Sequence, residues 1–145
     1  MRDAESIVSA LGLIPHPEGG HYVETWRAAA AAAERPSGTA IYYLLRRGES
    51  SAWHRVDAAE AWHFYAGDPL ELSIAAGSGE EAPRRHVLGP DIEVGQRPQF
   101  VVPPGDWQAA ASLGEWTLVG CTVSPGFRFE GFELAEPGWE PGRSR

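Results

Sequence analysis

The stretch that decides the fold is GESSAWHRVDAAEAWHFYAG, residues 48–67. It contains two runs that are typical of β-strands, 51–56 and 60–65, and a short segment between them that predicts a turn. Because side chains alternate along a strand, His54 and Val56 share one face. The turn is expected to bring Glu60 to a position beside His54. A histidine next to a carboxylate can bind a metal ion or move protons, so this pair is the first candidate site.

The rest of the chain is divided into short apolar runs by turn residues. The 145 residues include 17 glycines and 12 prolines, which is frequent punctuation of the kind found in all-β domains. We expect strands at 21–26, 39–45, 51–56, 60–65, 70–75, 84–88, 99–102, 107–111 and 116–123, with a shorter one within 127–134. This succession predicts a sandwich or barrel, such as a jelly roll.

Two segments depart from the strand pattern. Residues 3–11 predict one short N-terminal helix, because Ile7, Val8 and Leu11 share a helical face and Gly12 follows as a stop signal. The alanine-rich segment 28–33 is followed closely by Pro36, so we expect an exposed loop there instead of a long helix.

Length, charge and cysteine content narrow the class of protein. The chain has the size of a single domain, 1–145, with a core at about 11–134. Its net charge is -8 and its 12 Lys and Arg are scattered, which argues against nucleic acid and membrane as partners. The polar start of the chain and the lack of a membrane-length apolar run predict a cytoplasmic protein. The single cysteine, Cys121, lies in an apolar run and is expected to be a buried core residue.

The spacing within 48–67 resembles the first signature of the cupin superfamily. Gly48, His54, Glu60 and Gly67 fall in step with that signature, and Val56 stands where its second histidine is expected. The second cupin signature resembles the stretch 103–112 in its Pro-x-Gly turn. There, Gln108 and Ser112 replace the expected histidine and asparagine.

Four further stretches, 16–20, 60–69, 102–108 and 120–127, are similar to an uncharacterised group of single-domain cupins filed as a domain of unknown function. The resemblance covers about 11–134. It implies an all-β, single-domain cupin jelly-roll β-barrel (RmlC-like) with a short N-terminal helix. Since the cupin fold serves many activities, the resemblance alone does not select one.

The ligand set expected for a cupin metal centre is incomplete in this sequence. Such a centre typically takes three histidines and a glutamate, whereas this chain offers His54, Glu60 and Gln108. An amide oxygen is a weak ligand for a transition metal, and Val56 offers no donor. We therefore predict no cofactor. The alternative is a divalent metal held weakly by His54, Glu60 and Gln108.

An acid–base pair in an aromatic pocket remains as the leading interpretation. His54 and Glu60 are predicted to be the catalytic residues. The predicted ligand-binding residues are Trp62, Phe64, Phe100, Gln108 and Glu18. Glu18 lies in a turn-rich segment with His16 and His21, for which a turn or surface role stays open. His63 is expected on the outer face of its strand.

These residues support three functional hypotheses. The first is a protein that binds a small polar, ring-containing ligand, sugar- or nucleotide-like, and acts as an isomerase or epimerase through His/Glu acid–base chemistry. The second is a metal-dependent cupin enzyme with a reduced ligand set. The third is a non-catalytic metabolite-binding or sensor protein. In each case the resemblance implies a homodimer.

Overall fold

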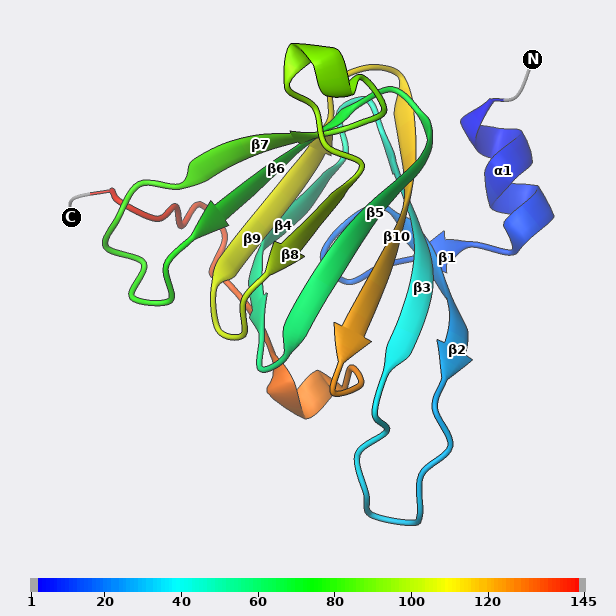
Figure 1. Cartoon of the computed structure of the whole chain (residues 1–145), viewed down its shortest axis with the longest axis vertical. Coiled ribbons are helices and arrows are strands. Elements are labelled where there is room, and N and C mark those ends of the chain that lie inside the picture. The colour runs from blue at the N-terminus through cyan, green and yellow to red at the C-terminus, as the bar shows by residue number, and fades with distance from the viewer. Residues whose placement is uncertain (1–2, 144–145) are drawn as a thin grey trace.

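Two antiparallel β-sheets pack face to face in the computed structural model, which describes residues 3–143 (Figure 1). In spatial order, the first sheet contains β1 (Ile14–Pro15), β2 (His21–Arg27), β3 (Thr39–Arg46), β10 (Trp116–Ser124), β5 (Ala59–Gly67) and β8 (Gln99–Val102). The second contains β11 (Phe132–Leu134), β4 (Ser50–Val56), β9 (Trp107–Ser112), β6 (Leu70–Ala75) and β7 (Arg84–Leu88). Two 3-10 turns cover Ile92–Val94 and Phe129–Gly131. The all-β prediction is confirmed, although hydrogen bonds do not join the two sheets into one closed barrel.

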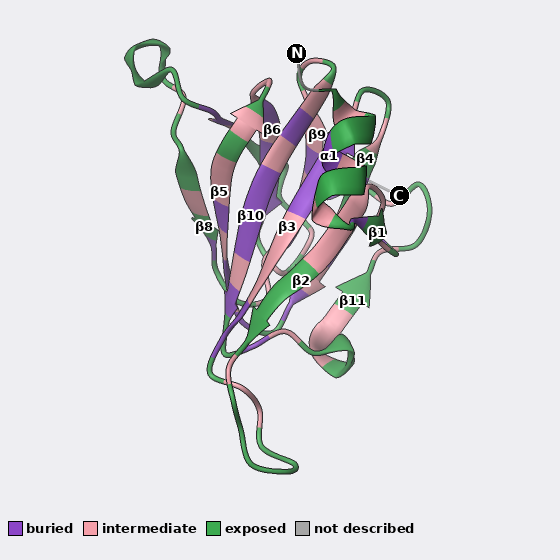
Figure 2. Cartoon of the chain, turned by 90° about the vertical axis from the view of Figure 1, so that its right-hand side faces the viewer, coloured by how far each residue is buried: buried purple, intermediate pink, exposed green. Residues whose placement is uncertain are grey.

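The one α-helix within the described residues, α1 (Ala4–Leu11), also agrees with the sequence. The backbone N–H of Ser6 donates to the side chain of Asp3 at 2.8 Å, which caps the first turn. The helix ends at Gly12, whose φ of 69° is the left-handed conformation common at helix ends. Ile7 packs with Leu44 of β3, so the helix covers part of the outer face of the first sheet (Figure 2). No helix within residues 3–143 has the length and hydropathy that a membrane crossing requires.

The segment between β4 and β5 joins two strands that lie in different sheets. β4 pairs with β9 and β11, whereas β5 pairs with β10 and β8. The chain therefore crosses from one sheet to the other at this point. Burial explains the crossing: Ala58 packs inside with Val56, while Asp57 faces outward and binds the guanidinium of Arg35 at 2.6 Å. His54 and Glu60 thus approach the interior from opposite sheets.

The space between the sheets has a packed part and a hollow part. Tyr43, Trp62, Leu72 and Leu88 are fully buried in the packed part. Half-buried and buried residues alternate along much of β10, and the buried ones mark the same inner face (Figure 2). Since the large side chains fill only part of the interior, room is left for the cavity described below.

The loops and surface agree with two further expectations. Residues 28–38 join β2 to β3 as a mostly exposed loop that extends well beyond the sheets (Figure 1).

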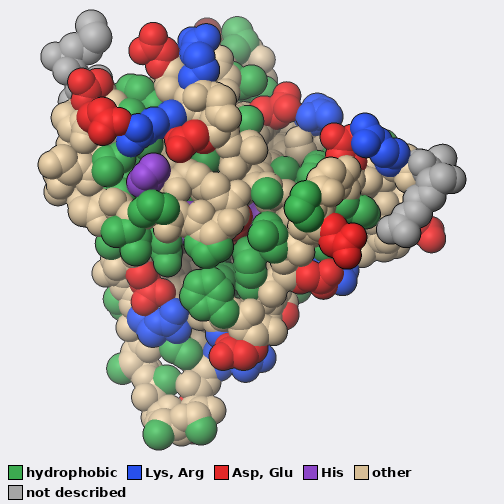
Figure 3. Space-filling view, turned by 180° about the vertical axis from the view of Figure 1, so that it is seen from behind, with side chains coloured by type: hydrophobic (Ala, Val, Ile, Leu, Met, Phe, Trp, Pro, Cys, Tyr) green, Lys and Arg blue, Asp and Glu red, His purple; other side chains and the backbone are tan. Residues whose placement is uncertain are grey.

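On the face seen from behind, acidic and basic side chains are interspersed around a hydrophobic middle (Figure 3). The described side chains of this face therefore form no basic stripe of the kind that nucleic acid would need.

Candidate active site

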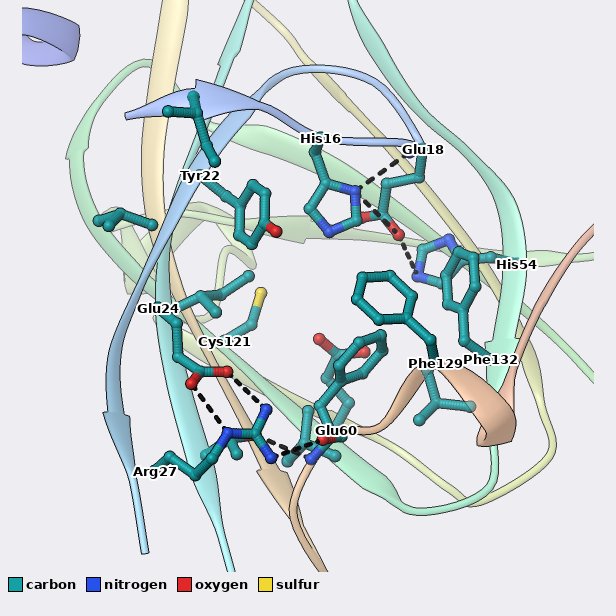
Figure 4. Close-up of a pocket in the computed structure, with 17 residues that line it drawn as sticks. His16, Glu18, Tyr22, Glu24, Arg27, His54, Glu60, Cys121, Phe129 and Phe132 are labelled. Carbon is teal, nitrogen blue, oxygen red and sulfur yellow. Dashed lines mark hydrogen bonds and ion pairs between the residues drawn. The ribbon is translucent and has the colours of Figure 1, made fainter. Parts of the chain in front are cut away.

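A cavity of about 420 Å³ opens between the two sheets, next to the packed core. Its wall combines ionisable side chains with aromatic rings (Figure 4). His16, Glu18, His54 and Glu60 contribute two imidazole and two carboxyl groups to it, and Arg27 lies paired with Glu24 at its edge. Phenylalanines from the segment before and within β11 form part of the opposite wall. The cavity is the candidate site because polar and aromatic groups converge there.

Glu18 reaches the cavity because the turn before β2 lies tightly against β4. The backbone N–H of Ala52 donates to the carbonyl oxygen of Glu18 at 2.8 Å. The next residue, Gly19, has a φ of 113°, and a Cβ atom there would lie 2.1 Å from the carbonyl oxygen of Ser50. The hydroxyl of Tyr43 also donates to the carbonyl of Gly19. Only glycine permits this close approach, which holds the neighbouring Glu18 over the interior.

His54 and Glu18 form a buried pair. Nε2 of His54 lies 3.1 Å from Oε2 of Glu18, and both side chains are almost completely buried. Nδ1 of His54 lies 2.7 Å from the carbonyl oxygen of Ala52, which can only accept a hydrogen bond, so Nδ1 carries a proton. Oε1 of Glu18 accepts a hydrogen bond from Ser51 at 2.9 Å.

The protonation of this pair follows from its burial. Burial lowers the pKa of His54 and raises the pKa of Glu18. Both shifts favour the neutral forms of the two groups. The contact between Nε2 and Oε2 therefore holds one proton, which Glu18 donates to the imidazole in the neutral state. A second proton there would have to charge the buried imidazole.

Glu60 is the second acid–base group of the cavity. The amide of Gln108 donates to Oε1 of Glu60 at 3.0 Å, and its own oxygen accepts from the indole N–H of Trp62 at 2.7 Å. Burial raises the pKa of Glu60 to about 7, with His54 and Gln108 acting in the opposite direction. Glu60 therefore changes charge near neutral pH, which suits a group that both accepts and donates protons.

Cys121 lines the cavity as well as the core. It is 1 % exposed, as expected from its apolar run. Burial raises the pKa of its thiol well above the ordinary value, so the thiol stays protonated. In this form Cys121 helps to stabilise the ionised carboxylate of Glu60.

The structure brings some of the predicted site residues to the cavity and leaves others outside its wall. His54, Glu60 and Glu18 line it. Trp62, Phe64 and Phe100 instead belong to the packed core or lie against it. Gln108 is fully buried on β9, beside His54 on β4, and both ends of its amide are already bonded within the protein. In this geometry Gln108 orients Glu60 and does not itself line the cavity.

Three other histidines lie outside the cavity wall. His63 points away from the interior, with Nε2 3.0 Å from the hydroxyl of Thr122, which agrees with the expected outer-face position. His21 lies 3.9 Å from Glu49, and His86 packs on the ring of Phe100. Neither has a contact with His54 or Glu60 in the described hydrogen bonds and ion pairs.

The phenylalanines of the cavity were not foreseen from the sequence. Phe127, Phe129 and Phe132 contact one another edge to face, with ring centroids 5.0–6.3 Å apart. The sequence feature that could have indicated this cluster is the run GFRFEGF at 126–132, in which three phenylalanines recur at short intervals. The sequence could not show that this run returns to cover the interior.

The donor groups of the cavity do not fit the metal centre expected of a complete cupin signature. Within residues 3–143, no three His, Cys, Asp or Glu side chains are grouped closely enough to hold a metal ion. Val56 lines the cavity where an imidazole would be needed, and the amide of Gln108 is bonded to Trp62 and Glu60. We therefore derive no chemistry through a metal.

The two sheets and the ionisable cavity between them define the class of the protein as a small cupin-type jelly roll. The family described as "Cupin superfamily (DUF985)" matches residues 5–135. The chain belongs to this family, which confirms the resemblance stated from the sequence. No curated protein matches the chain at a significant level.

Solved structures agree with this assignment. A protein of Shewanella oneidensis, SO0799, is 40 % identical with a TM-score of 0.87, and the match covers 93 % of this chain and 85 % of that one. A hypothetical protein from Leishmania major is 32 % identical with a TM-score of 0.84, covering 92 % and 88 %. Oxalate decarboxylase from Bacillus subtilis is 12 % identical with a TM-score of 0.63, covering 83 % of this chain and 29 % of that one. The last similarity concerns the fold alone.

Proposed function

We propose that the protein binds a small polar ligand that contains a ring and acts on it as an isomerase or epimerase by acid–base chemistry. The observation that carries the proposal is the carboxyl group of Glu60, which lines the cavity with a pKa of about 7. The neutral pair of His54 and Glu18 lies in the wall of the same cavity. The site therefore holds two groups that can exchange protons near neutral pH.

The two groups have complementary roles in the proposed reaction. An isomerase or epimerase of this kind removes a proton from one position of its substrate and returns a proton to another position or face. Ionised Glu60 is suited to accept the first proton, and the proton held between Glu18 and His54 is available for the return. The products are the rearranged ligand and the same protein with its protons redistributed.

The proposed roles differ from those expected from the sequence alone. The sequence suggested His54 as the base, with Glu60 orienting it. In the structure the carboxylate in contact with His54 is that of Glu18, and Glu60 is oriented by Gln108 instead. We therefore assign Glu60 and the His54–Glu18 pair as the two catalytic groups, with Gln108 as a positioning residue.

The test begins with the ligand itself. Native mass spectrometry of the untagged protein is expected to show a small polar ring compound that is released on unfolding. When that compound is incubated with the protein in heavy water, exchange should incorporate deuterium into it. With the compound added at a saturating concentration, Glu60→Gln should slow deuterium incorporation at least about 100-fold, in the range of a lost general acid or base.

A matched control and a contrary outcome complete this experiment. Glu71→Gln makes the same chemical change on β6, at a residue paired with Arg85 outside the cavity, and should leave exchange unchanged. A tightly bound compound with no deuterium incorporation in the native protein would contradict the enzyme and support a non-catalytic binding protein.

We also propose a homodimer, formed through the outer face of the first sheet. Tyr65 and Val101 are more than half exposed there, although both are apolar or aromatic. The ring of Tyr65 packs edge to face with Tyr42 of the neighbouring part of the sheet. Light scattering should show a dimer that Val101→Lys converts to a monomer, and a monomeric native protein would contradict the proposal.

A further inference from the structure

The charges of the cavity wall are unevenly balanced. Arg27 is the one arginine or lysine among the described residues that line it. Its guanidinium donates to both carboxylate oxygens of Glu24, at 2.9 and 2.8 Å, and also to the carbonyl oxygen of Phe127 at 3.1 Å. The positive charge of Arg27 is therefore already matched within the protein.

The histidines of the cavity wall do not add a fixed positive charge. Burial lowers the pKa of both His16 and His54, which favours their neutral forms. The other two groups are the carboxyl groups of Glu18 and Glu60. Each of these residues is less than a tenth exposed. The described ion pairs give Glu60 no basic partner and give Glu18 only the two histidines. Two buried carboxyl groups thus lack the counter-charge that would stabilise their ionised forms.

The opposite wall is aromatic and apolar. Phe127, Phe129 and Phe132 form a cluster that lines the cavity, and Phe132 packs 5.6 Å from the ring of His54. Aromatic faces attract organic cations, whose hydration shell is weak enough to be lost on binding. A metal ion would instead need several close donors, which the described residues do not group together.

Building on the proposed ligand cavity, we infer that its ligand is a ring-bearing organic cation, such as a protonated cyclic amine. The ammonium group would approach Glu60 and Glu18, and the ring would lie against the phenylalanine cluster. Such a ligand supplies the counter-charge that the cavity lacks. A phosphate or carboxylate group would meet two carboxyl groups without a free basic side chain, so anionic rings such as nucleotides do not fit the cavity.

Three probes with one ring and different charges test this inference. Cyclohexylammonium, cyclohexanol and cyclohexanecarboxylate are titrated into the isotopically labelled protein at pH 7.5, and NMR shifts of the cavity residues give the dissociation constants. We expect cyclohexylammonium to bind about tenfold more tightly than cyclohexanol, as for one hydrogen bond to a charged group. Cyclohexanecarboxylate should cause no shifts of the cavity residues.

Variants assign the preference to the two carboxyl groups. Glu60→Gln should weaken cyclohexylammonium binding about tenfold and leave the affinity for cyclohexanol within about twofold. Glu18→Gln serves as the second variant if Glu60→Gln does not fold. Glu71→Gln, outside the cavity, should change neither affinity.

The possible failures can be told apart. If cyclohexanol or cyclohexanecarboxylate binds in the cavity as tightly as cyclohexylammonium, the cation inference is overturned while the ligand cavity stands. If cyclohexylammonium does not bind, the inference is also overturned. The proposed isomerase is tested separately, by the compound that co-purifies and its deuterium incorporation.

Discussion

Oε2 of Glu18 lies 3.1 Å from Nε2 of His54, although the two residues come from separate parts of the chain. Glu18 lies in the turn before β2, and His54 lies in the middle of β4 in the opposite sheet. The contact engages Nε2 of the histidine that falls in step with the first cupin signature. His54 and Glu18 therefore form a proton-sharing pair.

The first prediction concerns the tautomer of His54. Because Nδ1 faces the carbonyl oxygen of Ala52 at 2.7 Å, we expect Nδ1 to carry the proton and Nε2 to act as the acceptor at pH 7. The ¹⁵N chemical shifts of the two ring nitrogens distinguish the tautomers directly. Glu18→Gln should preserve this tautomer, since an amide N–H can also donate to Nε2. A proton found on Nε2 of the native protein, with Nδ1 unprotonated, would disprove the arrangement.

The second prediction concerns the pH dependence of stability. The pKa of Glu60 is raised from 4.5 to about 7 in the folded protein. Between these two pH values the carboxyl group is therefore protonated in the folded state and ionised in the unfolded state. This group's contribution to stability is therefore greatest below pH 4.5 and falls as the pH rises to about 7. The difference corresponds to about 3 kcal/mol of unfolding free energy.

Denaturant unfolding at pH 5 and pH 8 measures this effect. Glu60→Gln removes the titration, so the variant should gain stability relative to the native protein as the pH rises. Glu71→Gln, on the outer face of β6, provides the control for a glutamate outside the cavity. Equal pH profiles for the native protein and Glu60→Gln would contradict the raised pKa of Glu60.

The third prediction concerns Gln108 as a link between the core and the site. Gln108→Leu leaves the indole N–H of Trp62 and the carboxyl group of Glu60 without their shared partner. We expect a loss of about 1–3 kcal/mol in the free energy of unfolding, and a further rise in the pKa of Glu60. Urea unfolding and ¹³C NMR titration of the carboxyl group measure the two effects. Gln99→Leu, at an exposed position of β8, should produce neither change.

The fourth prediction concerns the glycine that places Glu18. Gly19→Ala introduces a Cβ atom 2.1 Å from the carbonyl oxygen of Ser50, in a backbone conformation with φ of 113°. We expect the variant to lose about 1–3 kcal/mol of stability and to displace Glu18 from His54. Gly48→Ala is the matched control, because its φ is also positive but its Cβ would meet no atom within 4 Å. Similar losses in both variants would show that conformation, not close approach, is responsible.

Local sequence patterns determined much of the fold. Apolar runs and the turn residues between them placed every strand except the two-residue β1 within a few residues of its observed limits, and the stop signal at Gly12 placed the end of α1. These features depend on neighbours close in the chain, so the sequence shows them directly. The spacing of His54 and Glu60 within 48–67 also identified two residues that line the cavity.

Tertiary structure decided how these elements meet. The sequence predicted a turn between β4 and β5, but it did not show that the two strands belong to different sheets, with Ala58 buried between them. It also grouped Trp62 with the site, whereas this large ring completes the packed core. The partnership of Glu18 with His54 depends on contacts between distant segments, at Gly19 and Ser50. Such contacts are set by packing across the whole domain, which no short stretch of sequence contains.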